Sequence, residues 1–515
     1  MAATIAWLPL SGNSPRELDG AALGISWRAD WDRGEVRSSE QVRRPVLFAS
    51  LPEPGLLNPL LVIAAELSRR GIHDVWFATD EHRRSDVAAL TLDTPVEFAS
   101  LGPVIPELSA VTWDDHVYRE MTQPSRFKAH RAILRQTYRP GLWTVKFRAL
   151  EAVVDKVQPA MLVVDSTSTF AIDLARARKI PYVLSVPFVP SNVLTSHVPF
   201  GRSYAPRSFP VANSGLPYRM TRRQRMANTM FRFRTLAIFL SPGMSRVLRE
   251  DSKIRRKLGL GGPNPLGRVD DAAAVLCYSI TELEYPLPLP PKFRLVGAAV
   301  PPLPQGPGDR GLASWLDAHP CVVYIGLGTI TRLTRAEIEA MVEVARRLAG
   351  RHAILWKLPR EQQNLLPPPG RLPDNLRVES WMPSQLDVLA HPNVKVFFTH
   401  GGGNGFHEGL YFGKPLVIKP LWVDNFDQAV RGEEFGVSLT LDRPQTIDPD
   451  DVADKLTRVL DTPAFTAKAE HCSALLRAAG GRAAAADLVL EVLGSAPGPA
   501  AVSSRTVSSR GDESR

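Results

Sequence analysis

A group of polar residues around a run of glycines has the composition and spacing of an anion-binding site. His400 is followed by glycines at 401–403 and then by Asn404, and Glu408 lies four residues further on. Residues four apart lie on the same face of a helix, and glycines let the backbone turn sharply and approach a ligand closely. A helix that begins here would present free N–H groups and the positive end of its dipole to a phosphate. The pattern predicts a site for a pyrophosphate that carries a hydroxylated sugar.

The elements on either side of these residues must hold them in place. The β-branched and aromatic run from Val394 to Thr399 is typical of a buried parallel strand, and a helix can follow the glycines. In doubly wound sheets, ligands bind at the carboxyl ends of such strands. A glycine-rich turn alone is a weak signal, because several folds and ordinary tight turns share it.

Two flanking segments make the pattern specific. Residues 381–392 read Trp-Met-Pro-Ser-Gln-Leu-Asp-Val-Leu-Ala-His-Pro, and residues 413–425 read Gly-Lys-Pro-Leu-Val-Ile-Lys-Pro-Leu-Trp-Val-Asp-Asn. Together with residues 394–408 they resemble the donor-binding signature of the UDP-dependent glycosyltransferases of family 1, the GT-B type. Looser similarity continues through residues 322–329 and 280–284.

The resemblance implies an α/β fold in which two doubly wound, Rossmann-like domains face each other across a cleft. It also implies a hexosyltransferase that works without a metal or a cofactor. The expected partners are a UDP-sugar as co-substrate and a small hydrophobic acceptor.

The resemblance further implies roles for residues of the donor side. Trp381 would stack on the uracil, and Glu408 would accept hydrogen bonds from the ribose hydroxyl groups. Asp424 and Asn425 stand where the family has an Asp-Gln pair that grips the sugar, and because Asn is one methylene shorter, the donor sugar stays open. Gln385 aligns with a family glutamine, although this chain has one additional residue before it. The residues expected to hold the pyrophosphate as charge builds on the leaving UDP are Thr329, His400, Gly402, Gly403, Asn404 and Gly405.

The family reaction inverts the anomeric carbon and needs a base that takes the proton of the acceptor hydroxyl. In many relatives that base is a histidine in a Gly-His-x-Asn-Pro sequence after the first strand, oriented by an aspartate on a later strand. Here residues 55–59 read Gly-Leu-Leu-Asn-Pro, so Leu56 takes the place of the histidine, whereas Asp165 matches the aspartate. A leucine cannot accept a proton.

Three interpretations of this departure stay open. In the first, Glu53 or Asp165 is the base, since burial raises the pKa of a carboxyl group toward neutrality. In the second, the acceptor is acidic enough, as a phenol or a carboxylate is, that positioning beside the donor suffices. In the third, the protein binds a nucleotide sugar without transferring it. His73, His116 and His407 are also available, although core or surface roles are commoner for such histidines.

Strand-like and helical segments alternate along most of the chain, which predicts parallel, doubly wound sheets. Val275 to Ser279 is expected as the last strand of the first sheet, and Asp448 followed by Pro449 as a helix start. The expected organisation is a flexible N-terminal extension (1–43), an acceptor-binding domain (44–285), a Pro/Gly-rich linker (286–313), a nucleotide-sugar-binding domain (314–494) and a disordered tail (495–515).

Length and composition are those of a soluble globular protein. The 515 residues suggest two domains, and 44% hydrophobic and 22% charged residues are ordinary proportions. No run approaches the ~20 apolar residues of a membrane-spanning helix, and the first residues do not resemble a secretory signal. Three distant cysteines fit neither a disulfide framework nor a metal site. We therefore expect a cytoplasmic protein.

Residues 219–257 carry an unusual positive charge. They contain twelve Lys or Arg and two Asp or Glu, a net charge of +10, against +9 for the whole chain. Apolar residues are interleaved with the arginines, which predicts an amphipathic basic helix. This helix could be a solvated face over the acceptor pocket or could touch an anionic membrane surface. Nucleic-acid binding is not expected, because no recognition motif accompanies the charge.

Overall fold

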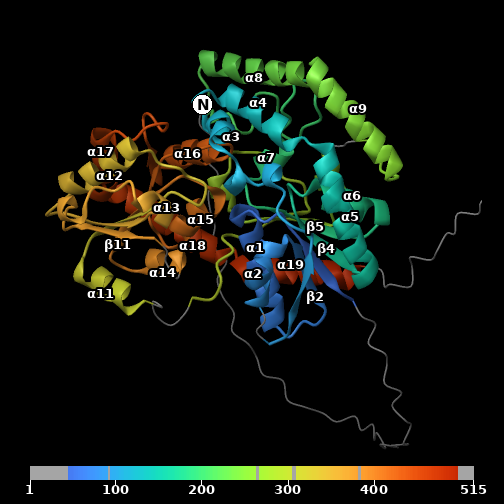
Figure 1. The fold of residues 1–515 in the computed structure, drawn as a ribbon, viewed down its shortest axis with the longest axis horizontal. Coiled ribbons are helices and arrows are strands. Elements are labelled where there is room, and N and C mark those ends of the chain that lie inside the picture. Colours follow the sequence, from blue (N-terminus) through green and yellow to red (C-terminus); the bar gives the residue numbers. More distant parts are fainter. Residues whose placement is uncertain (1–43, 91–92, 263–265, 304–308, 381–383, 497–515) are drawn as a thin grey trace, which may run out of the picture. The chain divides into compact units, whose positions relative to one another are not determined.

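The computed structural model describes residues 44–496, except 91–92, 263–265, 304–308 and 381–383 (Figure 1). The expected N-terminal extension (1–43) and almost all of the expected tail (495–515) therefore lie outside the described residues. Trp381, the residue expected to stack on uracil, lies outside them as well. All described elements belong to one compact unit.

Seven strands form the first sheet. They are β1 (Val46–Ala49), β2 (Val75–Thr79), β3 (Val96–Ser100), β4 (Met161–Asp165), β5 (Tyr182–Val186), β6 (Ala274–Cys277) and β7 (Phe293–Leu295). They pair in parallel in the order β3-β2-β1-β4-β5-β6-β7. β1, β4, β5 and β6 are buried at every position, as continuous apolar runs in a parallel sheet covered on both faces should be.

Helices connect these strands. They are α1 (Pro54–Arg69), α2 (Arg84–Ala88), α3 (Asp115–Thr122), α4 (Arg126–Thr137), α5 (Pro140–Val157), α6 (Thr169–Arg178), α7 (Ser191–Leu194), α8 (Arg222–Leu240), α9 (Pro242–Lys257) and α10 (Gly267–Asp270). Helix α1 begins at Pro54, and proline can open a helix because the first helical position needs no N–H partner.

The second sheet has six strands. They are β8 (Val322–Gly326), β9 (Ala353–Lys357), β10 (Leu376–Glu379), β11 (Val394–Thr399), β12 (Leu416–Ile418) and β13 (Ser438–Thr440), parallel in the order β10-β9-β8-β11-β12-β13. Its helices are α11 (Arg310–Ala318), α12 (Arg335–Arg347), α13 (Arg360–Gln363), α14 (Gln385–Ala390), α15 (Gly403–Tyr411), α16 (Asn425–Glu434), α17 (Pro449–Asp461) and α18 (Pro463–Ala478). Asp448 caps α17, as predicted.

The prediction that Val275–Ser279 forms the last strand of the first sheet is wrong. β7 pairs with β6 from within the stretch expected to be a linker, 286–313. A strand of three residues between prolines and a glycine is too short to show the alternation that marks a strand in a sequence.

The last helix, α19 (Gly481–Ser495), belongs to the first sheet, although the second domain was expected to reach residue 494. It packs on α1, and its Ala485 and Val489 are buried in one core cluster with Phe48 of β1 (Figure 1). We call β1 to β7, their connecting helices and α19 the first domain, and α11 to α18 with β8 to β13 the second domain.

The strand order reverses at one point in each sheet, between β1 and β4 in the first domain and between β8 and β11 in the second. Ligands of doubly wound sheets bind at these points, beyond the carboxyl ends of the strands. The predicted class, α/β with two doubly wound Rossmann-like domains, is therefore confirmed. Over the described ranges, no helix has both the length and the hydropathy that crossing a bilayer requires.

Candidate functional site

The glycine-rich turn lies beyond the carboxyl end of β11 and opens α15. Gly402 precedes the helix as its N-cap, and Gly403 to Gly405 form the first turn, whose N–H groups have no partner within the helix. A Cβ on Gly403 would stand 2.3 Å from the carbonyl oxygen of Pro187 in the first domain. This position therefore requires glycine, since the start of α15 is in close contact with the first domain.

His400 lies inside this turn as a neutral imidazole. A Cβ on Gly402 would come within 2.4 Å of its Nε2 atom, and one on Gly328 within 2.6 Å of its Cε1 atom. Burial lowers the pKa of His400 to about 4, and its Nδ1 atom has no hydrogen-bond partner among the described residues. Thr329, one residue after Gly328, is exposed. The Nδ1 atom of the buried His400 ring thus has a hydrogen-bonding capacity that the described residues leave unused.

Gln385 and Glu408 are brought together by α14 and α15. The Gln385 Nε2 atom donates to the Glu408 Oε2 atom at 2.7 Å, and the Tyr324 hydroxyl donates to the Gln385 Oε1 atom at 3.2 Å. Burial raises the pKa of Glu408, while Gln385 and Lys357 act in the opposite direction. The amide of Gln385 thus holds the Glu408 carboxylate in one orientation.

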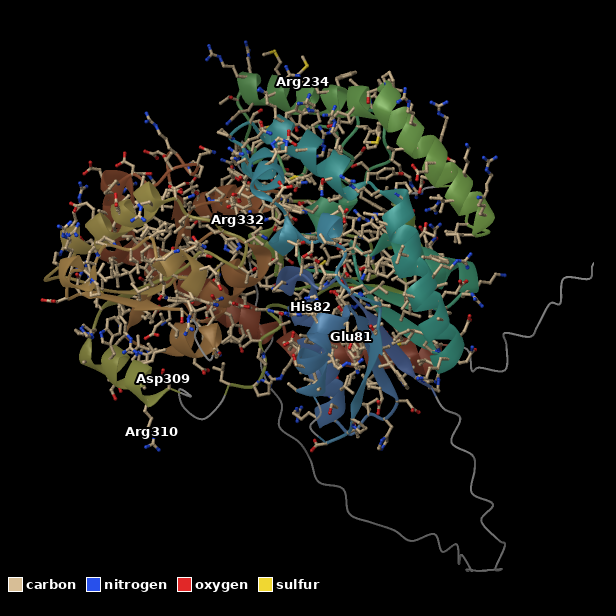
Figure 2. The ribbon with its side chains drawn as sticks, viewed as in Figure 1. Glu81, His82, Arg234, Asp309, Arg310 and Arg332 are labelled. Carbon is tan, nitrogen blue, oxygen red and sulfur yellow. The ribbon has the colours of Figure 1, made fainter. Side chains whose placement is uncertain are left out.

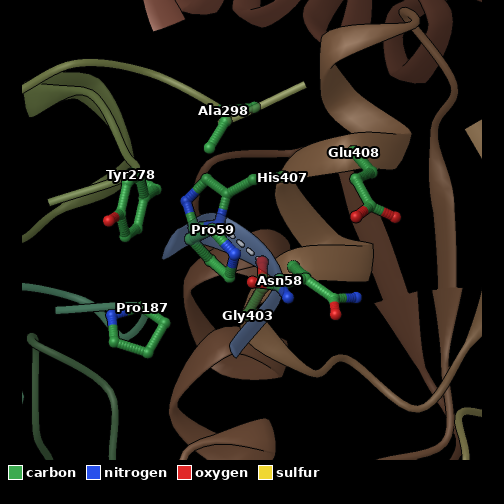
Figure 3. Close-up of a pocket in the computed structure, with 10 residues that line it drawn as sticks. Asn58, Pro59, Pro187, Tyr278, Ala298, Gly403, His407 and Glu408 are labelled. Atoms are coloured by element: carbon green, nitrogen blue, oxygen red, sulfur yellow. Dashed lines mark hydrogen bonds between the residues drawn. The ribbon is translucent and has the colours of Figure 1, made fainter. Parts of the chain in front are cut away.

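A pocket opens beside α15 between the two domains (Figure 3). Its walls include Asn58 and Pro59 of α1, Pro187 after β5, and Gly403, Asn404 and Glu408 of α15. The Asn404 Nδ2 atom also donates to the carbonyl oxygen of Pro54 at 3.4 Å. Residues expected on the donor side thus share a pocket with the loop and helix that follow β1.

His407 has a structural position. Its Nδ1 atom lies 2.7 Å from the carbonyl oxygen of Gly403 (Figure 3). Its Nε2 atom lies 2.8 Å from the Ser279 hydroxyl. Burial lowers its pKa to about 4. A neutral ring that donates through Nδ1 and accepts through Nε2 satisfies both contacts, so His407 links the two domains and has no nitrogen left to act as a base.

Asp424 and Asn425 lie at the start of α16, and both are buried. Burial, reinforced by the nearby carboxylate of Asp427, raises the pKa of Asp424 to about 7. The Asn425 Oδ1 atom accepts from the Trp422 N–H at 3.4 Å. A Cβ on Gly403 would lie 3.9 Å from the Asp424 Oδ2 atom, so this carboxyl group is close to the start of α15.

Glu53 is the N-cap residue of α1, just beyond the carboxyl end of β1. Both carboxylate oxygens are shielded from solvent, and no hydrogen bond of ordinary geometry reaches either of them within the described residues. Burial raises the pKa of Glu53 to about 7; the Ser109 hydroxyl opposes part of this shift, and the charges of Asp165 and Asp80 add to it. Such a carboxyl group can take and give a proton near neutral pH.

Asp165 ends β4, the strand next to β1, and is saturated with hydrogen bonds. Its carboxylate accepts from the backbone N–H groups of Leu51, Thr167 and Ser168 at 3.0, 2.8 and 3.0 Å, and from the hydroxyls of Thr167 and Ser168. The bond from Leu51 ties the loop after β1 to β4. Leu56, at the position of the family histidine, is buried in the hydrophobic core.

A segment of the first domain that the sequence did not single out reaches the donor side. The rings of Trp113 and Trp422 meet edge to face with centroids 5.3 Å apart. The Arg332 guanidinium pairs with Asp115 at 2.8 Å, and the Arg332 N–H donates to the Tyr118 hydroxyl at 3.0 Å. No periodic pattern marks such contacts, because each joins residues more than 200 positions apart.

Comparison with known proteins places these features in a family. The sequence profile of the UDP-glucuronosyl and UDP-glucosyl transferases matches residues 79–478. The chain is 29% identical over 305 residues to UDP-glucuronosyltransferase 2B9 of Macaca fascicularis, which covers 57% of this chain and 53% of that protein. It is 26% identical over 311 residues to UDP-glucosyltransferase 2 of Dactylopius coccus, covering 59% and 55%. The chain thus spans about half the length of the curated relatives it matches.

The fold has close counterparts among solved structures. The crystal structure of the kitacinnamycin glycotransferase superposes with a TM-score of 0.62 at 22% identity, covering 87% of this chain and 99% of that one. At this level of identity the match concerns the fold, and it extends over both domains.

Proposed function

Because the chain belongs to the UDP-glucuronosyl and UDP-glucosyl transferase family and has its GT-B fold, we propose that it transfers a sugar from a UDP-sugar to a hydroxyl group of a small acceptor, with Glu53 as the base. The observation that carries this proposal is the Glu53 carboxyl group: its oxygens are shielded from solvent, no hydrogen bond of ordinary geometry reaches them within the described residues, and burial raises its pKa to about 7. It lies at the switch point of the first sheet, whereas the proposed donor residues lie at that of the second.

The donor would lie along the start of α15. The N–H groups of Gly403, Asn404 and Gly405 and the Nδ1 atom of His400 would bind the pyrophosphate, since helix N-termini and neutral imidazoles can donate to anions. Glu408, held by Gln385, would accept from the ribose hydroxyl groups. Asp424, Asn425 and Thr329 would face the sugar and the β-phosphate.

The reaction would be a direct displacement with inversion. The acceptor oxygen attacks the anomeric carbon while the bond between that carbon and the leaving phosphate oxygen breaks, and UDP leaves with the electron pair. The hydroxyl proton passes to the Glu53 carboxylate. The negative charge that develops on UDP is met by the α15 N–H groups and by His400, where fixed dipoles in a buried site stabilise it most.

Asp165 would position this base. Its hydrogen bond from the Leu51 N–H fixes the loop that carries Glu53, and five donors already occupy its oxygens. An acceptor in the small, lipophilic class of alcohols and phenols is proposed from the sequence resemblance alone.

UDP release with a panel of alcohol and phenol acceptors tests the proposal, with UDP-glucose and UDP-glucuronate as donors. Glu53→Gln should lower kcat by about a hundredfold to ten-thousandfold, as expected for loss of a general base, and should leave UDP-sugar binding unchanged. Glu81→Gln is the matched control, because Glu81 is an exposed glutamate of the same domain (Figure 2).

Two outcomes would favour the other interpretations. If the Glu53→Gln protein still releases UDP with phenols but not with alcohols, acidic acceptors need no base. Absence of release with every pair, together with UDP-sugar binding that Glu408→Ala abolishes, would indicate a binding protein; no observation on the molecule favours that alternative at present.

A further inference from the structure

Helix α8 has apolar residues on two opposite faces. Phe231 and Ile238 are buried against the first domain. On the other side, Met226, Met230, Phe233 and Leu240 are exposed by 67%, 47%, 46% and 71%. Their spacings of four, three and seven residues place them in one stripe along the helix. The α8 stripe, as we call these four residues, has no covering element among the described residues.

The α8 stripe is part of a larger apolar patch. Phe200 is 73% exposed, and its ring meets that of Phe233 edge to face with centroids 6.1 Å apart. Five of the nine large hydrophobic residues that are exposed in the described chain belong to this patch. Single exposed hydrophobic residues are common on soluble proteins, but a contiguous patch of them marks a binding surface.

The patch is bordered by arginines that have no acidic partner among the described residues. α8 carries Arg222, Arg223, Arg225 and Arg234 as exposed residues and has no Asp or Glu. None of these four forms an ion pair within the described part of the chain. Arg234, labelled on α8 in Figure 2, lies over the ring of Phe127 as a cation–π pair.

The fifth arginine of α8 has a different role. Arg232 is buried and donates to the carbonyl oxygens of Ser196, Arg207 and Phe209. The buried face of α8 is thus fixed to the first domain by specific contacts. The exposed arginines and the α8 stripe are therefore the parts of α8 that can contact a partner.

We propose that the α8 stripe, Phe200 and the neighbouring arginines dock on an anionic lipid bilayer. A helix that lies parallel to a membrane inserts its apolar side chains at the acyl boundary while its basic side chains contact lipid phosphates. α9, which follows directly, extends the basic surface with exposed Arg246, Arg249, Lys253, Arg256 and Lys257.

The charge favours lipid over a second copy of the chain. Docking of one α8 stripe on another would bring the unpaired arginines of both helices together with no acid between them, which costs free energy. An anionic bilayer supplies the opposite charge at high density and an apolar layer beneath it. The proposal is independent of the glycosyl-transfer activity proposed above.

The test measures flotation of the full chain with phosphatidylcholine vesicles, with and without phosphatidylglycerol. We expect binding only to the anionic vesicles, decreasing as salt is raised, because salt screens the charge. Met226→Ser, Phe233→Ser and Leu240→Ser together should abolish flotation. Arg222→Gln, Arg223→Gln and Arg225→Gln together should weaken it about a hundredfold, at about fivefold for each arginine near an anionic surface.

Matched controls use the same chemistry elsewhere. The first control protein lacks three exposed apolar residues outside the patch, through Val111→Ser, Val145→Ser and Leu303→Ser. The second lacks three exposed arginines outside α8 and α9, through Arg310→Gln, Arg371→Gln and Arg443→Gln. Both control proteins should bind vesicles as the unaltered chain does. Circular dichroism on every variant excludes loss of fold.

Several results would overturn the proposal. One is the absence of flotation for the unaltered, folded chain, and another is equal flotation of the α8 stripe variant and the unaltered chain. Concentration-dependent dimerisation or RNA binding that the α8 variants lose, without vesicle binding, would assign the surface to a second copy or to a nucleic acid instead.

Discussion

Two carboxyl groups at the switch point of the first sheet have opposite surroundings. Asp165 accepts hydrogen bonds from five donors, whereas the shielded carboxylate oxygens of Glu53 receive no hydrogen bond of ordinary geometry from the described residues. Burial without compensating hydrogen bonds favours the neutral form of a carboxyl group and raises its pKa, as at Glu53. The surroundings of the two acids therefore favour Glu53 over Asp165 as the proposed base.

The pH dependence of the rate should report Glu53. Its pKa is raised to about 7 by burial, and a base must be deprotonated to act. We expect kcat/KM to rise with pH and to level off above about pH 7, and we expect Glu53→Gln to lose this limb. A profile that is flat from pH 5 to 8 in the unaltered enzyme would contradict the assignment, provided that Glu81→Gln behaves like the unaltered enzyme.

Asp424 should make stability depend on pH. Its pKa is raised from 3.8 in the unfolded chain to about 7 in the folded protein, first by burial and then by Asp427. At pH values between these two pKa values, the folded state binds one more proton than the unfolded chain. The resulting stabilisation of the folded state is complete below about pH 4 and is lost as pH rises through 7. Urea denaturation measures the free energy of unfolding at pH 5 and at pH 7. Between these values it should fall by about 2 kcal/mol more for the unaltered chain than for the Asp424→Asn protein.

The control for this measurement is Asp374→Asn, which changes an exposed aspartate. It should follow the unaltered chain at both pH values. Equal pH dependence of the Asp424→Asn protein and the unaltered chain would show that Asp424 is ionised in the folded state.

At the scale of elements, α3 and the turn before it form a bridge to the donor side. Trp113 packs on Trp422, two residues before Asp424, and Tyr118 and Asp115 hold Arg332, three residues after Thr329. The loops after β8 and β12 are thus held from the first domain. These contacts fix loops that the proposed donor sugar would touch.

Trp113→Ala should therefore raise KM for the UDP-sugar more than it lowers kcat. Loss of the edge-to-face pair is worth about 0.5–1.5 kcal/mol beyond the area it buries, which corresponds to a rise in KM of about two- to tenfold. Trp113→Phe, which keeps an aromatic ring, should restore most of the affinity. Unchanged KM in a folded Trp113→Ala protein would show that the bridge has no role in donor binding.

At the scale of the whole molecule, a buried ion pair joins the domains. Arg431 of α16 lies 2.7 Å from Glu284, which follows β6, and also donates to the Ser191 hydroxyl of α7. Both charged side chains are at most 4% exposed. On the same helix, Asp427 accepts from the backbone N–H groups of Asn213 and Gly215. Helix α16 therefore carries both Asn425 and residues that contact the first domain.

Glu284→Gln should destabilise the protein strongly, by about 3–5 kcal/mol, because it removes the carboxylate that pairs with the buried Arg431 charge. Replacing both residues, with Glu284→Met and Arg431→Met, should cost less than the single change, since neither charge of the pair is then left buried without the other. Denaturant unfolding of the single and double variants measures both effects. A double variant less stable than Glu284→Gln would contradict this account.

The exposed pair of Arg347 and Asp450 is the control. Arg347→Gln should change the free energy of unfolding far less, because water already solvates both partners.

The sequence by itself determined the fold class, the family and the candidate donor residues. Buried parallel strands have continuous apolar runs as their sequences, so the pattern predicts them directly. The glycine turn, Glu408 and the Asp424-Asn425 pair lie within one stretch of the chain, so the local sequence is enough to find them. Asp165 was identified because it matches the aspartate of the family, and Glu53 because it lies in the segment that carries Leu56.

The surroundings of these residues and the contacts between the domains became visible in the tertiary structure alone. The five donors around Asp165, the absence of any for Glu53 among the described residues, the return of α19 to the first sheet and the three-residue strand β7 depend on packing between distant segments. The exposed α8 stripe belongs here too, because a sequence shows that a helix has apolar residues but not which of its faces the fold covers. Burial and hydrogen bonding are properties of the folded chain, and no local pattern encodes them.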